Sequence, residues 1–103
     1  MNFPPFPFTV LDTETTGLIP RVHSVIEFAS VRIENGKIVD EYTQLLSIAE
    51  ELPPVTQTLT RIRPQDLAHQ PTFSDAQSQI LTHIGDNTLI FGQNVGFDIA
   101  MLK

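Results

Sequence analysis

The sequence predicts a mixed α/β domain. Its first half contains three runs rich in β-branched and aromatic residues, each bounded by turn residues. Apolar residues at helical spacing follow at about 74–84, and a further apolar strand then leads into the start of a second helix near residue 95. The order strand, strand, strand, helix, strand, helix is typical of domains in which helices cover a sheet.

Turn residues delimit the first three strands. Residues 8–11 form the first expected strand, and the segment 15–20 forms a turn that leads away from it. The second strand is expected at about 25–34. Asn35-Gly36 then predicts a type I′ hairpin turn, because both of its central positions need positive φ. The third strand, at about 37–46, is therefore expected to pair antiparallel with the second.

The middle of the chain is expected to be irregular over 47–71, with a short helical turn near 49–51. Ser74 and Gln77 then form a capping-box pattern, in which two side chains satisfy free amides at the start of a helix. Gly85 is expected to end that helix. Its apolar face is predicted to contain Phe73, Ala76, Ile80 and Ile84.

The last part of the sequence predicts a turn at 86–87, a fourth strand at 88–91 and a second helix from about 95, with Phe97 and Met101 on one face. No glycine or cap ends this helix before Lys103. We therefore expect that residues 1–103 are the N-terminal part of a single domain and that the fold is truncated.

Composition narrows the classes of function. Hydrophobic residues make up 41% of the 103 residues and charged residues 17%, a balance that indicates a packed core rather than disorder. The sequence has no cysteine, which excludes disulfide scaffolds, thiolate zinc sites and cysteine nucleophiles. It has no secretory signal, and no apolar run approaches the roughly 20 residues of a membrane span. We therefore expect a cytoplasmic protein with no membrane partner.

The charge balance argues against a protein that coats nucleic acid. Twelve acidic residues against six basic ones give a net charge of −6, whereas proteins that neutralise many phosphates are usually basic. An acidic nuclease is still allowed, because a divalent metal bound by carboxylates supplies the missing positive charge.

Asp12 and Glu14 are the first candidate site residues. Side chains two apart on a strand project to the same face, so these carboxylates are expected together at the end of the first strand. Strand ends are where α/β sheets place ligand sites. Two like charges so close need a proton or a cation between them, and oxygen ligands favour Mg²⁺ or Mn²⁺. The alternative, a solvated pair at a strand terminus, is the more frequent one for such a pair alone.

A third carboxylate, Asp98, lies early in the second helix, which follows the fourth strand. If that strand is parallel to the first, Asp98 comes towards Asp12 and Glu14, and Asn94 is placed to hold the loop or a substrate phosphate. The alternative makes Asp98 a favourable charge near a helix N-terminus and Asn94 its cap.

The two segments together resemble the first two signature motifs of the DEDD superfamily of 3′–5′ exonucleases, the DnaQ-like group that includes the proofreading epsilon subunit of bacterial DNA polymerase III. The first motif, D-x-E-T-T-G, corresponds to residues 12–17, and the second, commonly H-N-x-x-F-D, corresponds to residues 93–98. Residues 25–31 and 60–73 also resemble family segments, in the right order. The resemblance implies a ribonuclease H-like mixed sheet with flanking helices.

The resemblance also implies two-metal hydrolysis of phosphodiester bonds at a 3′ end, with two Mg²⁺ or Mn²⁺ ions about 3.5–4 Å apart. Asp12, Glu14 and Asp98 would be the ligands, and Asp12 would bridge both ions. The other implied site residues contact the terminal nucleotide or shape its site: Thr15, Thr16, Gly17, Leu18, Ile62, Asn94 and Phe97. The expected partner is a single-stranded or frayed 3′ end of DNA or RNA, with DNA favoured over RNA, and a DNA polymerase subunit is a further possible partner.

Three departures from the family pattern matter. Gln93 replaces the usual histidine, at a position that is not a metal ligand, and Arg61 replaces a glycine near the expected substrate terminus. The third motif, which supplies the general base and a fourth carboxylate, lies beyond the second motif and is missing. We therefore expect the chain alone to be inactive. No catalytic role is assigned to the solvated or structural Glu27, or to the histidines His23, His69 (a loop residue) and His83 (solvent-facing on its helix).

Two alternatives differ from the exonuclease interpretation. One is a non-catalytic remnant that binds metal, a nucleic-acid 3′ end or a polymerase. The other is a phosphatase-like hydrolase of the haloacid dehalogenase type with Asp12 as nucleophile. That motif needs a second aspartate where this chain has Glu14, and it leaves residues 93–98 unexplained.

Overall fold

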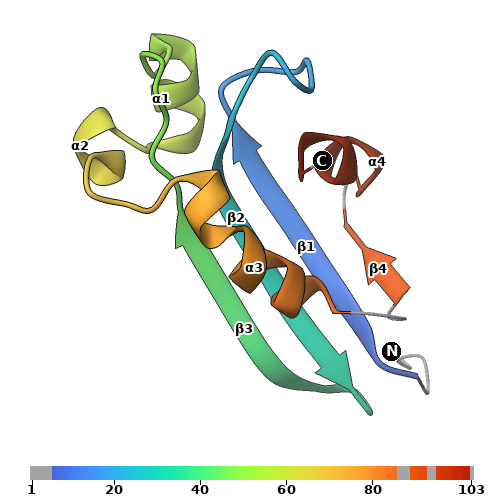
Figure 1. The fold of residues 1–103 in the computed structure, drawn as a ribbon. Coiled ribbons are helices and arrows are strands. Elements are labelled where there is room, and N and C mark those ends of the chain that lie inside the picture. The colour runs from blue at the N-terminus through green and yellow to red at the C-terminus, as the bar shows by residue number, and fades with distance from the viewer. Residues whose placement is uncertain (1–5, 86–88, 93–94, 103) are drawn as a thin grey trace.

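A four-stranded mixed sheet forms the centre of the computed structural model, which describes residues 6–85, 89–92 and 95–102 (Figure 1). The strand order is β3-β2-β1-β4, with β1 at Phe8–Thr15, β2 at Val25–Glu34, β3 at Lys37–Leu45 and β4 at Leu89–Phe91. The helices are α1 at Pro54–Thr60, α2 at Pro64–Leu67, α3 at Phe73–Ile84 and α4 at Val95–Leu102. This order of elements confirms the predicted mixed α/β class.

Strand β1 has a neighbour on each side. It pairs antiparallel with β2 and parallel with β4, and the parallel pairing is the condition under which Asp98 was expected to approach Asp12 and Glu14. The β2–β3 hairpin turns at Asn35 and Gly36, whose φ angles of 53° and 75° confirm the type I′ turn. The expected turn at 86–87 and Thr88 lie outside the described residues. The parallel pairing places the segment after β4, and hence α4, beside the end of β1.

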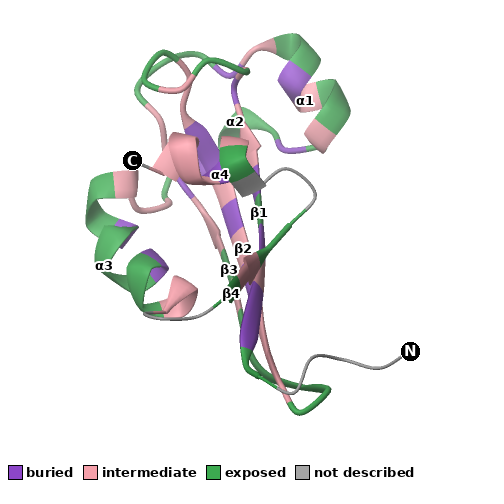
Figure 2. Cartoon of the chain, turned by 90° about the vertical axis from the view of Figure 1, so that its right-hand side faces the viewer, coloured by how far each residue is buried: buried purple, intermediate pink, exposed green. Residues whose placement is uncertain are grey.

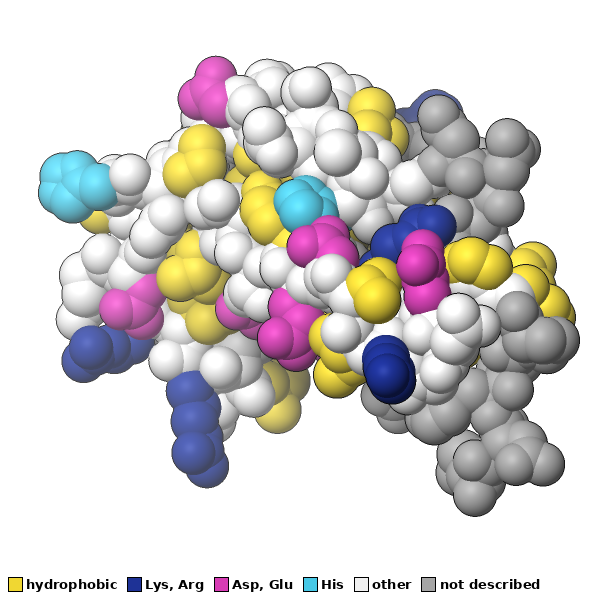
Figure 3. Space-filling model, turned by 90° about the horizontal axis from the view of Figure 1, so that it is seen from below, with side chains coloured by type: hydrophobic (Ala, Val, Ile, Leu, Met, Phe, Trp, Pro, Cys, Tyr) yellow, Lys and Arg dark blue, Asp and Glu magenta, His cyan; other side chains and the backbone are white. Residues whose placement is uncertain are grey.

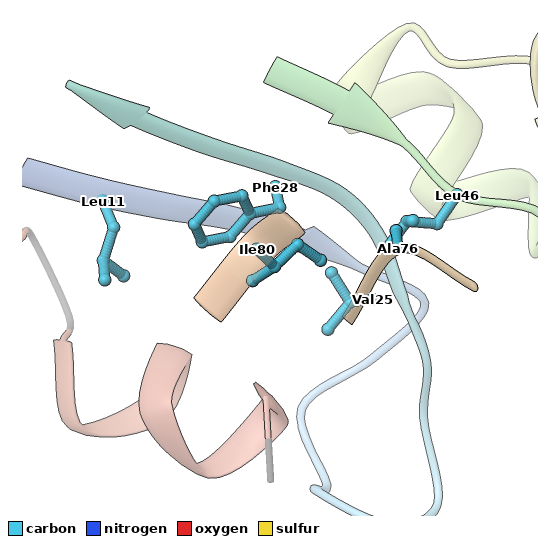
Figure 4. Packing of buried hydrophobic residues seen from close by; sticks show 6 residues of the cluster. All are labelled: Leu11, Val25, Phe28, Leu46, Ala76 and Ile80. Atoms are coloured by element: carbon cyan, nitrogen blue, oxygen red, sulfur yellow. The ribbon is translucent and has the colours of Figure 1, made fainter. Parts of the chain in front are cut away.

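The main core lies between the sheet and the helices α3 and α4. Ile80 of α3 lies beside Phe28 of β2, and Ala76 lies beside Leu46, in one buried cluster that also contains Leu11 of β1 (Figure 4). The buried parts of α3 face the strands, and its exposed side faces away (Figure 2). The outer members of this cluster are only partly buried: Tyr42, Phe73, Ile84, Ile90, Ile99, Met101 and Leu102. The predicted apolar face of α3 is therefore confirmed.

The structure corrects the expectation for residues 47–71. Residues 49–51 form no helix, whereas α1 and α2 lie beyond the sheet at the end where β1 and β3 finish (Figure 1). Each helix has a proline in its first turn, where the missing amide hydrogen costs no intrahelical bond. The prolines therefore start these helices rather than interrupt the chain. Arg61 ends α1 with φ 62°, a left-handed conformation that favours glycine.

The structure also moves the start of α3. Thr72 is the N-cap, and its Oγ1 accepts a hydrogen bond from the amide of Asp75 at 3.1 Å, while Asp75 Oδ2 accepts one from the amide of Thr72. The predicted box of Ser74 and Gln77 is therefore wrong by two residues. Starting the helix at Phe73 places its ring against the core, and this packing favours the earlier of two overlapping capping patterns.

We expect Thr72→Ala to lower the free energy of unfolding by about 1 kcal/mol, because it removes the N-cap acceptor of α3. Ser74→Ala, the matched control, is expected to change it by less than about 0.5 kcal/mol, as for an exposed position without a special contact. Urea denaturation followed by circular dichroism measures both. A larger loss for Ser74→Ala would contradict the observed cap.

His83 differs from its expected solvent-facing position. Its ring stacks on Tyr42 with the ring centroids 4.0 Å apart, and its Nδ1 lies 2.6 Å from Oδ2 of Asp40. The helix α3 crosses the sheet, so a residue beside its apolar face meets β3. His69 is exposed in the turn after α2, as expected.

The surface seen from below shows acidic, basic and apolar side chains interspersed (Figure 3). Among the described residues drawn there, the basic side chains form no continuous stripe across this face. This agrees with the net charge of −6. None of the helices in the described part of the chain has the length and hydropathy of a membrane span.

Candidate functional site

The carboxylates of β1 lie where the sequence predicts them. Asp12 is exposed and Glu14 is half-buried near the end of the strand, and the alternation of side chains places both on one face. The antiparallel register sets Glu27 of β2 directly opposite Glu14. A third carboxylate, which sequence reasoning assigned a structural or solvated role, therefore joins the pair.

Asp98 is anchored to Thr13, which lies between those two carboxylates and points to the opposite face of β1. The hydroxyl of Thr13 donates a hydrogen bond of 2.6 Å to Oδ1 of Asp98, whose side chain is only 3% exposed. Its other oxygen, Oδ2, is buried without a hydrogen-bond partner. A buried acceptor with no donor is costly. The Asp98 carboxyl is therefore poised to take a proton or a cation.

The pKa values of three carboxyl groups show how the charges interact. Burial raises the pKa of Glu14, and repulsion from Asp12, Glu27 and Asp98 raises it further. Burial and then Asp12 raise the pKa of Glu27. For Asp98 the pKa is raised by burial and by Asp12, against the lowering effect of the hydrogen bond from Thr13. The charge of Asp12 therefore acts on every other carboxylate of this cluster.

The predicted ligands Asp12, Glu14 and Asp98 interact electrostatically, but they do not form a coordination sphere. Over residues 6–85, 89–92 and 95–102, no three acidic or histidine side chains lie in an arrangement that would hold a metal ion. The chemistry of the donors nevertheless fits a hard divalent cation, since every donor is a carboxylate oxygen and Oδ2 of Asp98 has no other partner. A cation would also relieve the repulsion that raises these pKa values.

The loop after β1 begins with residues predicted to contact a nucleotide. The hydroxyl of Thr15 donates to the carbonyl of Gly17 at 2.6 Å, which closes a tight local turn. Leu18 is 81% exposed at the tip that follows. An apolar side chain this exposed, in the loop that follows the carboxylates of β1, is accessible to a ligand.

The remainder of this loop is tied to the body of the protein. The amide of Thr16 donates to the carbonyl of Ser24, and the amide of Ser24 donates back to the hydroxyl of Thr16, both at 2.9 Å. Thr56 of α1 donates to the carbonyl of Thr16 at 3.4 Å, and Ser24 Oγ donates to Glu50 at 2.6 Å. Thr16 is therefore a buried anchor of the loop.

The remaining predicted site residues lie farther from this loop or outside the described residues. Ile62 belongs to a second core cluster with Ile26, Leu52 and Leu67, so most of its side chain is buried. Phe97 is half-buried on α4, next to Asp98. Asn94 lies outside the described residues, as does Gln93. The roles of these residues towards a substrate stay predictions.

Sequence reasoning missed three residues that the structure adds: Thr13, Glu27 and His23. Thr13 was passed over as the variable position between two carboxylates, although its hydroxyl fixes Asp98. Glu27 depends on the register between β1 and β2, and the loop that joins these strands has no diagnostic two-residue turn. His23 contacts the loop through its ring nitrogen.

The raised pKa values of Glu14, Glu27 and Asp98 predict that this cluster destabilises the metal-free protein increasingly as the pH rises above about 4, the ordinary carboxyl range. The folded state keeps protons on Glu14, Glu27 and Asp98 that the unfolded state releases at lower pH, so the folded state becomes relatively worse as these groups ionise. The measurement is urea denaturation from pH 4 to pH 8 with a chelator present.

The contribution of this cluster is the difference between the wild type and Glu14→Gln at each pH. We expect that difference to favour Glu14→Gln increasingly as the pH rises, and excess Mg²⁺ to remove it. A difference that stays constant with pH would show that Glu14 has an ordinary pKa.

Comparison with known sequences shows what this chain is similar to. The profile of the exonuclease (RNase_T) family matches residues 9–103. The PolC-type DNA polymerase III of Thermotoga petrophila is 34% identical over 96 residues, which is 93% of this chain and 7% of the relative. The PolC-type DNA polymerase III of Halalkalibacterium halodurans is also 34% identical over 96 residues. The chain thus spans about 7% of the length of the curated relatives that it matches.

Comparison with solved structures shows the same architecture. Exonuclease X in complex with 5′ overhanging duplex DNA is 26% identical, with a TM-score of 0.75 over 93% of this chain and 54% of its own. Escherichia coli exonuclease I in complex with a dT13 oligonucleotide has a TM-score of 0.82 over 94% of this chain and 22% of its own, at 22% identity. The predicted ribonuclease H-like fold is confirmed.

Proposed function

The chain belongs to the exonuclease (RNase_T) family, and from this premise we propose that it is the metal-binding part of a 3′–5′ exonuclease domain. The observation that supports this most strongly is the group of carboxylates at the end of β1. Asp12, Glu14 and Asp98 repel one another, and Oδ2 of Asp98 is buried without a partner. Divalent cations would offset this repulsion and would give Oδ2 of Asp98 a partner.

Asp12, Glu14 and Asp98 would hold two Mg²⁺ or Mn²⁺ ions. When bound, such ions activate water and stabilise the oxygen that leaves in phosphodiester hydrolysis. Thr13 keeps Asp98 in position through its hydrogen bond. Glu27 adds negative charge opposite Glu14, which strengthens the attraction for cations without making Glu27 a ligand.

The loop after β1 would hold the terminal nucleotide. Leu18 is exposed and would pack against the last base, while the anchored Thr16 and the turn between Thr15 and Gly17 keep the backbone in place. Ile62 would contribute its accessible edge, and Asn94 and Phe97 would shape the segment around Asp98. The complexes of exonucleases X and I with DNA favour DNA over RNA as substrate.

Residues 1–103 would be the N-terminal part of the exonuclease domain. Asp12, Glu14 and Asp98 belong to the first two motifs, whereas the general base and the fourth carboxylate belong to the third. Without these two groups, this chain alone would bind a 3′ end but would not hydrolyse it. The relationship to PolC-type DNA polymerase III favours proofreading beside a polymerase as the role of the parent protein.

The test is binding of a fluorescent single-stranded deoxyoligonucleotide, followed by anisotropy, with gel analysis of its length. We expect binding that requires Mn²⁺, that weakens at least about tenfold when the 3′ end carries a phosphate, and that is insensitive to a 5′ phosphate. Glu14→Gln should abolish this Mn²⁺-dependent binding of the oligonucleotide. Glu41→Gln, at an exposed carboxylate of β3, is the matched control.

Two outcomes would contradict the proposal. Equal sensitivity to the 3′ and the 5′ phosphate would remove the 3′ end as the ligand. Metal-dependent shortening that Asp12→Ala abolishes would show that the chain is active alone.

A further inference from the structure

The ring of His23 occupies the space beside Gly17. A Cβ atom built on Gly17 would lie 2.4 Å from Cδ2 and 2.5 Å from Nε2 of His23, closer than real Cβ contacts allow. Gly17 is not among the described glycines with positive φ, so the backbone conformation does not demand glycine here. The requirement for glycine at the end of the D-x-E-T-T-G segment therefore comes from the ring of His23.

His23 also fixes the backbone of the same loop. Its Nδ1 accepts a hydrogen bond of 3.0 Å from the amide of Ile19, and its own amide donates one of 2.9 Å to the carbonyl of Ile19. Two bonds thus join the residues on either side of the loop tip. Because Nδ1 accepts this bond, Nε2 is the ring nitrogen that is left to carry a proton.

These contacts leave the ring little capacity for another role. Nδ1 is used by the amide of Ile19, and Nε2 lies against Gly17. A metal ligand or a general base needs a nitrogen lone pair directed at its partner. The ring of His23 instead contacts Gly17 and Ile19, the residues on either side of the exposed Leu18.

We propose that His23 is a positioning residue for the nucleotide-binding loop. Its ring fixes the conformation of the segment that contains Thr15, Gly17 and Leu18. This inference rests on the proposed function for its consequence in binding, because that function makes the loop the site of the terminal nucleotide. The contacts between His23, Gly17 and Ile19 give it a separate structural readout.

The first experiment compares two amide side chains at position 23 in the full chain. In His23→Asn the side-chain oxygen replaces Nδ1 and can accept from Ile19, whereas in His23→Gln the oxygen lies near the place of Nε2. We expect hydrogen exchange of the Ile19 amide, measured by NMR, to be at least about fivefold faster in His23→Gln and His23→Ala, the factor carried by one average hydrogen bond. His23→Asn should stay within about twofold of the wild type.

Binding of the deoxyoligonucleotide in Mn²⁺ is measured on the same variants. We expect binding to be about fivefold weaker in His23→Gln and His23→Ala and restored in His23→Asn. His69→Ala, at an exposed histidine in the turn after α2, is the matched control and should match the wild type in both measurements. If His23 had only a general structural role, its variants would lower thermal stability. Oligonucleotide binding would then not differ between His23→Asn and His23→Gln.

A double-mutant cycle tests the contact with Gly17. Gly17→Ala should weaken oligonucleotide binding about tenfold in the wild-type background but less than about twofold in His23→Ala, because the clashing ring is then gone. Additive effects would overturn the proposal, and so would unchanged Ile19 exchange in His23→Ala. If the wild type binds no oligonucleotide, the proposed function fails, and the exchange of Ile19 still decides whether His23 organises the loop.

Discussion

Ile80→Ala is expected to lower the free energy of unfolding by about 2–5 kcal/mol. Ile80 is 1% exposed on α3 and lies beside Phe28 of the sheet, in the buried cluster that also contains Leu11 (Figure 4). The substitution removes buried methyl groups and leaves a cavity that the helix and the strands fill only in part. Domains have about 5–15 kcal/mol of stability in total, so this single change removes a large share of it.

Leu81 provides the matched control, because it follows Ile80 on the same helix and is 58% exposed. Leu81→Ala is expected to change the free energy of unfolding by about 0.5 kcal/mol or less. Urea denaturation of both variants, followed by circular dichroism, makes the comparison. Equal losses would show that α3 does not pack on the sheet through the face that contains Ile80.

Asp98→Asn is expected to have opposite effects without and with divalent cation. Without cation the amide removes a buried charge that Asp12 repels, while its oxygen still accepts from Thr13, so the variant should be at least as stable as the wild type. With Mn²⁺ the wild type should gain stability and the variant should not. Its cation affinity should fall at least about tenfold, which corresponds to about 1.4 kcal/mol.

Thermal unfolding of the wild type and Asp98→Asn, each with and without Mn²⁺, measures these differences in stability. Glu41→Gln changes the net charge by the same amount at an exposed position of β3, and should behave like the wild type. A destabilised metal-free Asp98→Asn would show that Asp98 stabilises the fold as a charge. Retained stabilisation of Asp98→Asn by Mn²⁺ would remove Asp98 from the cation site.

Most of the sheet could be predicted because its signals are local. Asn35 and Gly36 specify the hairpin through their positive φ, and the apolar spacing of Ala76 and Ile80 specifies the buried face of α3. The parallel pairing of β4 with β1 was only a condition of the sequence interpretation, because two strands and three helices lie between these strands in the chain. The hairpin and the buried face of α3, in contrast, each depend on residues that are close together in the sequence.

The features that could not be predicted depend on contacts between distant segments. Glu27 joins the site only through the register of β1 and β2, and Thr13 matters only because α4 brings Asp98 to it. Packing of Phe73 against the core moved the start of α3, and packing on Tyr42 and Asp40 took His83 from solvent. The alternation of side chains along a strand and the spacing of apolar residues along a helix do not indicate these contacts between distant segments.

The central claim is that the carboxylates at the end of β1 bind divalent cations. Titration of the 15N-labelled chain with Mn²⁺ tests it directly, because this paramagnetic ion broadens the NMR signals of nearby amides. We expect the amide signals of residues 12–14 and of Asp98 to broaden early in the titration. This broadening should be lost in Asp12→Asn and kept in Glu41→Gln. No broadening, or broadening that begins at Glu50 and Glu51, would contradict it.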